Sequence, residues 1–246
     1  MHEDLHSPRI AALGVPQRRV CHGLKYASAR KHARVQEWRS QKIAILAVVK
    51  FHAQTRVLVP RARHAEVGDA LAATFAALPV GDPFDPQTQI GPLVSERQRQ
   101  RVEGYLSLAA QEGARVIGGG RPDHLGDGYY VCPALLTGVD NAMRVAQEEI
   151  FGPVVAVIPY DDETEAVRIA NNSIYGLSGS VWSADRDRAL AVARRIRTGM
   201  VSLNGAPQAF GTPFGGYKQS GIGREMGPEG LASYRELKSI ALGANA

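Results

Sequence analysis

Residues 178–203 read SGSVWSADRDRALAVARRIRTGMVSL, and this stretch decides the fold class. Its opening run, Ser178–Trp182, and its closing run, Met200–Leu203, have the composition of short strands. Between them, residues 185–197 carry apolar side chains at helical spacing. The residues that this spacing turns inward are Leu190, Val192, Ala193 and Ile196. A strand, a helix and a second strand in this order are typical of a parallel sheet with crossover helices.

The same alternation extends upstream. We expect further strands at residues 55–59, 115–117, 129–136 and 154–158, and further helices at residues 65–78, 95–111 and 163–171. Ser95 is the expected N-cap of its helix. The acidic pair Asp161 and Asp162 favours the start of the helix at 163 through the helix dipole. Pro159 is expected to end the preceding strand, since proline cannot donate to a ladder.

Composition is that of a soluble globular protein, with 44% apolar and 22% charged residues in a chain of 246. The longest apolar run, residues 43–49, is far shorter than the roughly 20 residues that cross a bilayer. The first eleven residues lack the pattern of a secretory signal. Cys21 and Cys132 form no CxxC pair. These features predict a cytoplasmic protein without disulfides or membrane contact.

Charge is unevenly distributed. Residues 1–50 contain ten basic and three acidic residues, whereas the remaining 196 contain nineteen and twenty-one. Clustered Lys and Arg can contact phosphates, so an arm that binds nucleic acid is one interpretation, which predicts salt-sensitive DNA binding lost on deleting residues 1–50. No recognition motif or interleaved aromatic residue supports it. The alternative, which we favour, is a solvated basic segment.

Several motifs converge on one family. Residues 147–154 read Gln-Glu-Glu-Ile-Phe-Gly-Pro-Val, and residues 213–225 read Pro-Phe-Gly-Gly-Tyr-Lys-Gln-Ser-Gly-Ile-Gly-Arg-Glu. Together with shorter matches at 80–84, 89–92, 171–177 and 200–204, these segments resemble the aldehyde dehydrogenase superfamily over about four-fifths of the chain. The resemblance implies oxidation of an aldehyde by NAD or NADP through a cysteine thioester, which water then hydrolyses.

The resemblance also assigns roles to individual residues. Glu149 matches the carboxylate that binds the nicotinamide ribose, and Phe151 matches the aromatic residue beside the nicotinamide. Gln98 and Arg101 lie in the helix whose equivalents touch the cofactor ribose. Phe214 and Phe210 match the aromatic wall of the aldehyde tunnel, and Asn204 marks the strand end that faces it. Glu225 matches a carboxylate proposed for proton relay.

Each role has a structural alternative. Phenylalanine side chains usually pack in cores, so Phe151, Phe210 and Phe214 could be core residues. Gln98 and Arg101 could lie on the solvent-exposed face of a helix. Gly215, Gly216, Gly221 and Gly223 do not form the GxGxxG fingerprint after a strand, so we interpret them as residues of tight turns rather than phosphate ligands. Cys132 is interpreted as a buried small apolar side chain, because no neighbour in the sequence would generate a thiolate.

The family's nucleophilic cysteine precedes a Thr-Arg pair, and counting back from Thr55 at the family's spacing lands on Phe51. A phenyl ring has no electron pair with which to attack a carbonyl. The family's Glu-Leu-Gly-Gly-like stretch with its general base, its oxyanion asparagine and its cofactor domain are also absent. We therefore expect a truncated aldehyde dehydrogenase that is inactive alone.

Three regions follow from this interpretation. Residues 1–52 form a basic segment unrelated to the family, helical or disordered, which a frameshift or an alternative start would explain. Residues 53–225 form the catalytic-domain portion, an α/β unit with a parallel sheet. Residues 226–246 form an oligomerisation tail, in which residues 234–242 resemble the strand through which these enzymes assemble.

A second hypothesis is a non-catalytic partner that co-assembles with a full-length aldehyde dehydrogenase or with itself. A zinc site is a third pattern to weigh, because residues 2–6 read His-Glu-Asp-Leu-His. This match begins at the second residue, is followed at once by Ser7 and Pro8, and has no third ligand. We expect no metal site.

Overall fold

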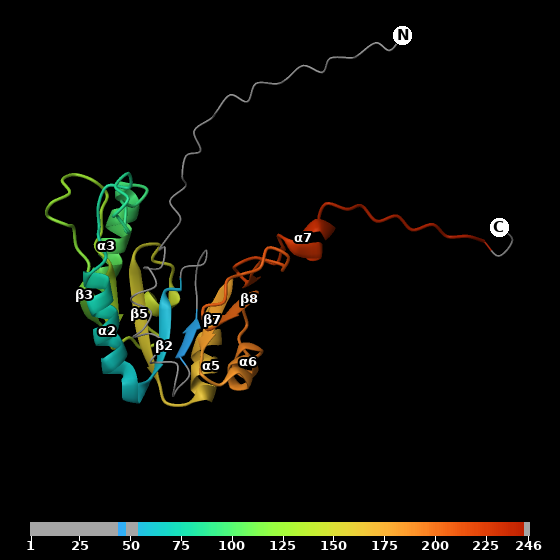
Figure 1. The fold of residues 1–246 in the computed structure, drawn as a ribbon, viewed down its shortest axis with the longest axis horizontal. Coiled ribbons are helices and arrows are strands. Elements are labelled where there is room, and N and C mark those ends of the chain that lie inside the picture. The colour runs from blue at the N-terminus through green and yellow to red at the C-terminus, as the bar shows by residue number, and fades with distance from the viewer. Residues whose placement is uncertain (1–43, 48–53, 244–246) are drawn as a thin grey trace, which may run out of the picture.

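The computed structural model describes residues 44–47, as backbone, and residues 54–243 (Figure 1). Its core is a seven-stranded sheet with the order β3-β4-β5-β2-β1-β7-β8. The strands of this sheet are β1 (Ala44–Ala47), β2 (Arg56–Pro60), β3 (Arg115–Gly118), β4 (Ala134–Thr137), β5 (Val154–Tyr160), β7 (Ser178–Trp182) and β8 (Met200–Leu203). A two-stranded sheet pairs β6 (Tyr175–Gly176) with β9 (Tyr217–Lys218).

Helices connect these strands. They are α2 (His64–Ala76), α3 (Glu96–Gln111), α4 (Arg144–Gln147), α5 (Glu163–Asn171), α6 (Arg186–Ala193) and α7 (Gly227–Ala232), with a short 3-10 turn η2 (Arg61–Arg63) before α2. Ser95 caps α3 by accepting from the Gln98 amide at 3.2 Å, as its position in the sequence predicts. Asp162 caps α5 in the same way through the Glu165 amide. No helix in the described part of the chain is long and apolar enough to cross a membrane.

Strand directions confirm a parallel core. β2 pairs in parallel with β5, β4 with β5, and β7 with β8. β3 runs antiparallel to β4 at one edge of the sheet. β1 runs antiparallel to both β2 and β7, so the two flanking strands share one direction. The amino ends of β2, β5, β7 and β8 therefore lie at one edge of the sheet.

The strand β1 corrects the expectation for the N-terminal segment, which treated residues 1–52 as helical or disordered. Its backbone pairs with β2 on one side and β7 on the other, joining the two parallel groups of strands. A continuous apolar run bounded by charged residues is typical of a strand enclosed by a sheet, and residues 43–49 have this pattern. The remainder of the N-terminal segment, including residues 1–43, lies outside the described residues.

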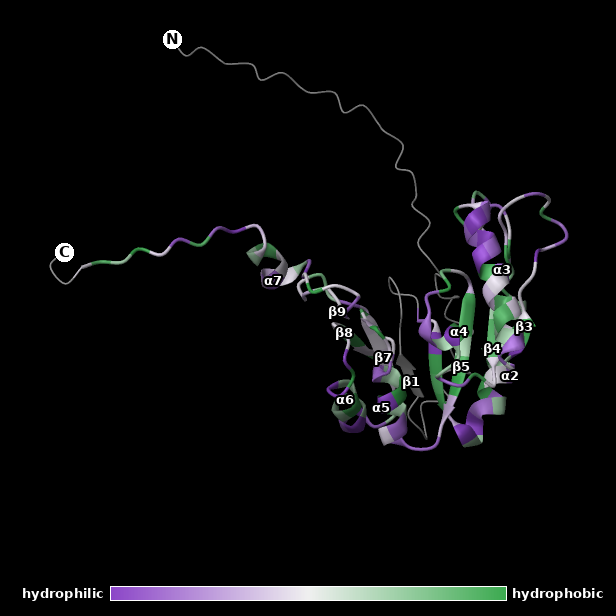
Figure 2. Ribbon diagram, turned by 180° about the vertical axis from the view of Figure 1, so that it is seen from behind, coloured by the Kyte–Doolittle hydropathy of each residue, from purple (hydrophilic) through white to green (hydrophobic). Residues whose placement is uncertain are grey.

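Apolar side chains of the sheet divide between two faces, because successive residues of a strand point to opposite sides. Val59 packs with Val67 of α2, Leu135 and Val157 on one face. Leu58 belongs to the larger cluster on the other face, which includes residues of α3, α4, α5 and α6. Figure 2 shows β4 and β5 coloured mainly as hydrophobic, whereas the helices combine hydrophilic and hydrophobic residues.

Some element boundaries differ from the sequence expectations. β4 begins at Ala134 rather than at residue 129. α6 ends at Ala193, and Leu190 is 38% exposed, so its predicted inward position is wrong. Pro159 lies inside β5, opposite Val59 of β2. Proline is tolerated there because β4 pairs with β5 only as far as Ala156, which leaves that side of β5 without a ladder.

The C-terminal residues extend away from the sheet after α7 (Figure 1). Residues 233–243 form no helix or strand in the structure, and their large apolar side chains are exposed. Those side chains are Tyr234, Leu237, Ile240 and Leu242.

Candidate functional site

A short loop precedes β5 and presents Glu149 and Phe151. Phe151 has a φ of 64°, a left-handed conformation that few non-glycine residues adopt, and its side chain is 53% exposed. Gly152 follows, and a Cβ there would overlap the side chain of Val102 in α3. Strained backbone at an exposed aromatic residue is a common feature of binding sites. The loop is therefore held against α3 in a conformation that exposes the ring.

Two side chains of α3 hold this loop. The amide of Gln98 donates to the carbonyl oxygens of Ile150 at 3.0 Å and Phe151 at 2.8 Å. The guanidinium of Arg101 donates to the carbonyl oxygen of Glu149. Both residues were predicted as cofactor contacts. The structure brings them beside Glu149 and Phe151, and it uses some of their donors to fix the loop backbone.

These four predicted residues border one open groove of about 490 Å³. The groove is lined by Val94, Ser95, Arg97, Gln98, Arg101, Glu149 and Phe151. Its size falls within the range of small-molecule sites, and it combines an aromatic ring with carboxylate, amide and guanidinium groups. Such a lining suits a polar ligand with a flat ring.

A network of charged and hydroxyl groups fixes the neighbouring Glu148. Arg144 binds its carboxylate through Nε at 2.7 Å and Nη2 at 3.1 Å, and the hydroxyl of Tyr105 donates to it at 2.7 Å. The hydrogen bonds from Arg144 and then Tyr105 lower the pKa of Glu148 to about 2. Arg101 also donates to the Tyr105 hydroxyl at 3.2 Å. Glu148 thus serves as an anchor for the loop.

The glycine-rich segment forms a second loop. Phe214 and Glu225 exchange two backbone hydrogen bonds of 2.7 Å each, which close this loop at its base. A Cβ on Gly215 would overlap the carbonyl oxygen of Gly223, and one on Gly216 would contact Ser220 closely. The interpretation of these glycines as residues of tight turns agrees with the close packing at Gly215 and Gly216 and with the φ of 101° at Gly221. Glu225 itself is exposed.

The pairing of β9 with β6 returns this loop to the edge where β7 begins. Asn204, in contrast, directly follows the carboxyl end of β8. Its side-chain amide exchanges two hydrogen bonds of 2.9 Å with the backbone of Ser183, so it ties two strand ends together. Phe210 is 87% exposed. None of Asn204, Phe210, Phe214 and Glu225 lines the groove beside Phe151.

Phe51, at the position of the family's nucleophile, lies outside the described residues, as do Cys21 and the His2–His6 motif. Cys132 is partly rather than fully buried. Desolvation, followed by the charge of Asp123, raises the pKa of its thiol. The prediction that Cys132 is buried is therefore wrong, whereas the raised pKa agrees with the expectation that no neighbour generates a thiolate. Among residues 54–243, no three His, Cys, Asp or Glu side chains gather in a group that could hold a metal.

Sequence reasoning missed several residues that shape the site. Tyr105 and Arg144 were not singled out, although Tyr105 follows Arg101 by four positions and Glu148 follows Arg144 by four. Pairs at this spacing share one face of a helix, which was the available signal. Arg56 was noted only as part of the Thr-Arg pair, and nothing local in the sequence indicates that its guanidinium is buried.

The lining of the groove suits one end of a nicotinamide cofactor. A ribose needs hydrogen-bond acceptors for its hydroxyls, which a carboxylate such as that of Glu149 supplies. A nicotinamide ring needs an apolar surface, which the exposed ring of Phe151 supplies. The groove thus fits the ribose and nicotinamide end of the cofactor.

Comparison with known proteins agrees with this arrangement. The family model described as "Aldehyde dehydrogenase family" matches residues 52–240, so β1 precedes the matched region. Geranial dehydrogenase from Castellaniella defragrans is 47% identical over 188 residues, which are 76% of this chain and 39% of that protein. The 3-succinoylsemialdehyde-pyridine dehydrogenase of a Pseudomonas species is 47% identical over 192 residues, 77% of this chain and 40% of that protein. The chain thus spans about 40% of the length of these relatives.

Solved structures give the same result. Aldehyde dehydrogenase of Mycobacterium tuberculosis complexed with NAD+ superposes with a TM-score of 0.76 at 51% identity, covering 78% of this chain and 40% of that one. A mutant of aldehyde dehydrogenase C from Pseudomonas syringae, complexed with NAD+ and octanal, gives 0.74 at 45% identity, covering 76% and 39%. Identity at this level over about three quarters of the chain, including both loops, shows common ancestry, and the chain belongs to the aldehyde dehydrogenase family.

Proposed function

We propose that this chain is the cofactor-facing portion of an NAD(P)-dependent aldehyde dehydrogenase and that it does not oxidise aldehydes alone. The observation that carries the proposal is the loop at Glu149 and Phe151, which Gln98 and Arg101 fix beside an open groove. The same segment carries the family motif. A nicotinamide cofactor, when bound, supplies the hydride acceptor for the oxidation.

The residues of this chain would then bind and orient the cofactor. Glu149 accepts hydrogen bonds from ribose hydroxyls, and the ring of Phe151 packs beside the nicotinamide. Gln98 and Arg101 restrict the loop, so less conformational entropy is lost when a ligand binds. Phe214, Phe210 and Asn204 belong to the wall of the aldehyde tunnel, and Glu225 to a proton relay, by their match to the family.

Catalysis also requires a nucleophile, and Phe51 occupies its position in the sequence. A phenyl ring has no sulfur atom and no lone pair with which to attack an aldehyde carbonyl, so no thioester forms at this position. The Glu-Leu-Gly-Gly-like stretch that carries the family's general base is missing from the 246 residues as well. Several parts of the mechanism are therefore lacking together.

The proposal is tested by incubating the purified chain with NAD+ or NADP+ and a panel of aldehydes while the absorbance of reduced cofactor is followed. We expect no turnover by the chain or by its Phe51→Cys variant, because a thiol alone does not supply the general base. Turnover by the unaltered chain would overturn the proposal. Turnover by Phe51→Cys alone would show that the side chain at 51 is the only missing part.

A second candidate function is that of an assembly partner for a full-length aldehyde dehydrogenase. The exposed tail supports it, since Leu237 is 98% exposed and Ile240 and Leu242 are 78% and 79% exposed. An extended segment that carries exposed apolar side chains can add to the sheet edge of another subunit. Such a tail would contribute backbone hydrogen bonds without any catalytic residue.

Light scattering coupled to size exclusion tests this candidate. We expect a defined oligomer at micromolar concentration and a shift to monomer when residues 234–246 are deleted. The deletion should leave the thermal unfolding midpoint of the sheet domain nearly unchanged, since residues 235–243 are exposed along their whole length. A monomeric full-length chain would contradict self-assembly through the tail.

A further inference from the structure

Tyr105 of α3 lies between an anion and a cation. Its hydroxyl donates to Oε2 of Glu148 at 2.7 Å and accepts from Nη2 of Arg101 at 3.2 Å. Tyr105 is 9% exposed and belongs to the larger hydrophobic cluster of the core. Its hydroxyl is therefore the middle of a chain of two hydrogen bonds, which runs from the wall of the groove to a carboxylate.

The charge of Glu148 fixes the direction of both hydrogen bonds. The pKa of Glu148, about 2, keeps its carboxylate ionised at neutral pH, so this group only accepts. The pKa of the Tyr105 hydroxyl is raised, first by desolvation and then by the hydrogen bond to Glu148, so the hydroxyl keeps its proton for that bond. An ionised acceptor polarises the hydroxyl, and the oxygen becomes a stronger acceptor for Arg101.

The ring of Tyr105 also holds Arg101. The guanidinium carbon of Arg101 lies 5.0 Å from the centroid of this ring, which is within the range of a cation–π contact. Arg101 and Tyr105 are four positions apart on one face of α3. The nitrogen that contacts the hydroxyl, Nη2, also donates to the carbonyl oxygen of Glu149. Tyr105 thus restrains Arg101 at two points, and Arg101 in turn restrains the loop.

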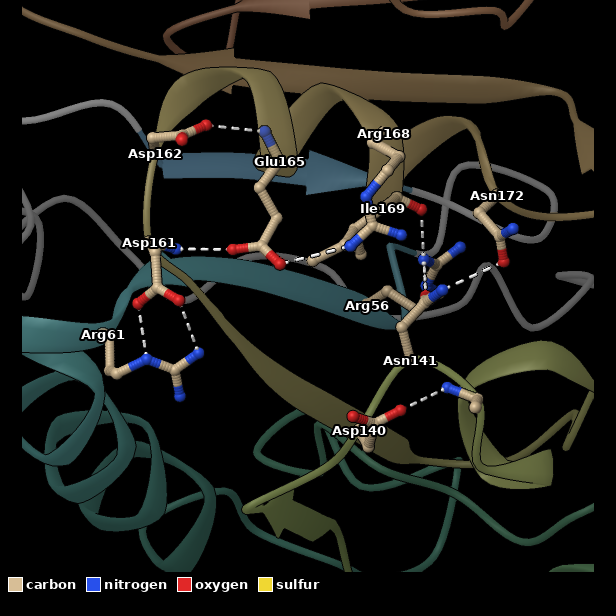
Figure 3. Close-up of polar contacts among 11 residues, drawn as sticks. Arg56, Arg61, Asp140, Asn141, Asp161, Asp162, Glu165, Arg168, Ile169 and Asn172 are labelled. Atoms are coloured by element: carbon tan, nitrogen blue, oxygen red, sulfur yellow. Dashed lines mark hydrogen bonds and ion pairs between the residues drawn. The ribbon is translucent and has the colours of Figure 1, made fainter.

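Arg101 differs from an arginine that pairs with an acid. Arg61 contacts both carboxylate oxygens of Asp161 directly (Figure 3). Among the described residues Arg101 forms no ion pair, and it reaches Glu148 only through the Tyr105 hydroxyl. Its other nitrogens, Nε and Nη1, have no acceptor in the described part of the chain, and its side chain lines the groove. The hydroxyl therefore fixes the guanidinium without neutralising it by direct contact.

We propose that Tyr105 is a positioning residue of the groove, whose hydroxyl, held by ionised Glu148, orients the guanidinium of Arg101 toward a bound nicotinamide cofactor. Tyr105 is not one of the residues that line the groove, so it acts through Arg101. Arg101 then donates through Nε and Nη1 to oxygen atoms of the cofactor. The identity of the ligand rests on the proposed function, whereas the positioning of Arg101 does not.

The first test compares the full chain with its Tyr105→Phe variant, which keeps the ring and loses the hydroxyl. Rotation of the Arg101 guanidinium, followed by ¹⁵N NMR, should become about twofold to tenfold faster, because one hydrogen bond is lost. The carboxyl group of Glu148, followed by ¹³C NMR, should titrate at a higher pH than in wild type, because the Tyr105 bond helps to lower its pKa. Unchanged rotation and titration would overturn the proposal.

Tyr217→Phe is the matched control. Tyr217 also lies beside an arginine, with Arg224 at 5.5 Å from its ring centroid, but it is 41% exposed and belongs to the second loop. This variant should leave the rotation of Arg101 and the titration of Glu148 as in wild type. A change equal to that of Tyr105→Phe would overturn the proposal.

A double-mutant cycle separates positioning from a general effect on packing. Glu148→Gln keeps the Tyr105 hydroxyl and removes the charge at the end of the chain, so it should also accelerate the rotation of Arg101. The double variant should rotate little faster than either single variant, because both substitutions break the same chain. Additive effects would show that the two residues act separately and would overturn the proposal.

The effect on the ligand is measured by titrating the full chain with NAD+ and following the amide shifts of residues 149–152. Tyr105→Phe should weaken the affinity about threefold to tenfold, and Tyr217→Phe should leave it unchanged. If wild type shows no shift, the proposed function fails, whereas the rotation and titration still decide the positioning of Arg101. Equal affinities of wild type and Tyr105→Phe would overturn the role of this positioning in cofactor binding.

Discussion

Gln98 donates to the carbonyl oxygen of Phe151 at 2.8 Å, across 53 positions of the sequence. This bond links the first turn of α3 to a residue whose φ of 64° is unfavourable for a side chain with a Cβ. Ser95 caps the same turn, so the helix start and the loop form one unit. The family motif thus depends on a helix that comes much earlier in the chain.

Replacing Gln98 by alanine should release this loop. Gln98→Ala removes two hydrogen bonds to backbone carbonyls, and we expect a loss of about 1–2 kcal/mol in the free energy of unfolding. Hydrogen exchange of the amides at 150–152 should accelerate several-fold. Gln100→Ala, exposed on the same helix, is the control and should change stability by less than about 0.5 kcal/mol. Equal hydrogen-exchange rates of these amides in the two variants would contradict the conclusion that Gln98 holds the loop.

Glu148 should give the chain an acid-dependent stability. Its folded pKa of about 2 lies below the ordinary value of 4.5, so its contribution is complete above about pH 4.5 and is lost as the pH falls toward 2. Its side chain is 38% exposed, and solvent screening limits the contribution to about 1 kcal/mol or less. Glu148→Gln should flatten the unfolding free energy between pH 5 and about 2 relative to wild type.

The acid titration has a control in Glu236→Gln, which lies in the exposed tail. It should leave the slope of stability against pH unchanged. Arg144→Gln should reduce the slope partly, because the Tyr105 hydrogen bond to Glu148 remains. A slope that is the same in wild type and Glu148→Gln would assign the acid sensitivity to other groups.

Two glycine substitutions should have opposite effects. Gly215→Ala places a Cβ against the carbonyl oxygen of Gly223, and because the obstacle is backbone we expect a loss of about 1–3 kcal/mol. Gly104→Ala lies in the exposed part of α3 with open space around its Cβ, and should stabilise the protein by about 0.5–1 kcal/mol. Urea unfolding midpoints measure both. Destabilisation by Gly104→Ala would show that the propensity argument fails at this position.

The sequence alone determined the features that depend on neighbours along the chain. α5, β7 and β8 occupy the predicted residues because periodicity, capping groups and turn residues act within a few positions. The motifs at 147–154 and 213–225 indicated the family, which the match over residues 52–240 confirms. Through the family resemblance, those motifs also predicted Glu149 and Phe151 as cofactor contacts.

Tertiary structure alone decided the contacts between distant segments. The placement of β1 between β2 and β7, the clamp of Arg101 on the Glu149 carbonyl and the burial of Arg56 all join residues far apart in the chain. Pro159 was predicted to end its strand, but whether β4 still pairs at that level depends on the register of the sheet. Periodicity indicates which side of an element is apolar. Which donor meets which acceptor is decided only when the elements pack together, because that geometry depends on the whole sheet.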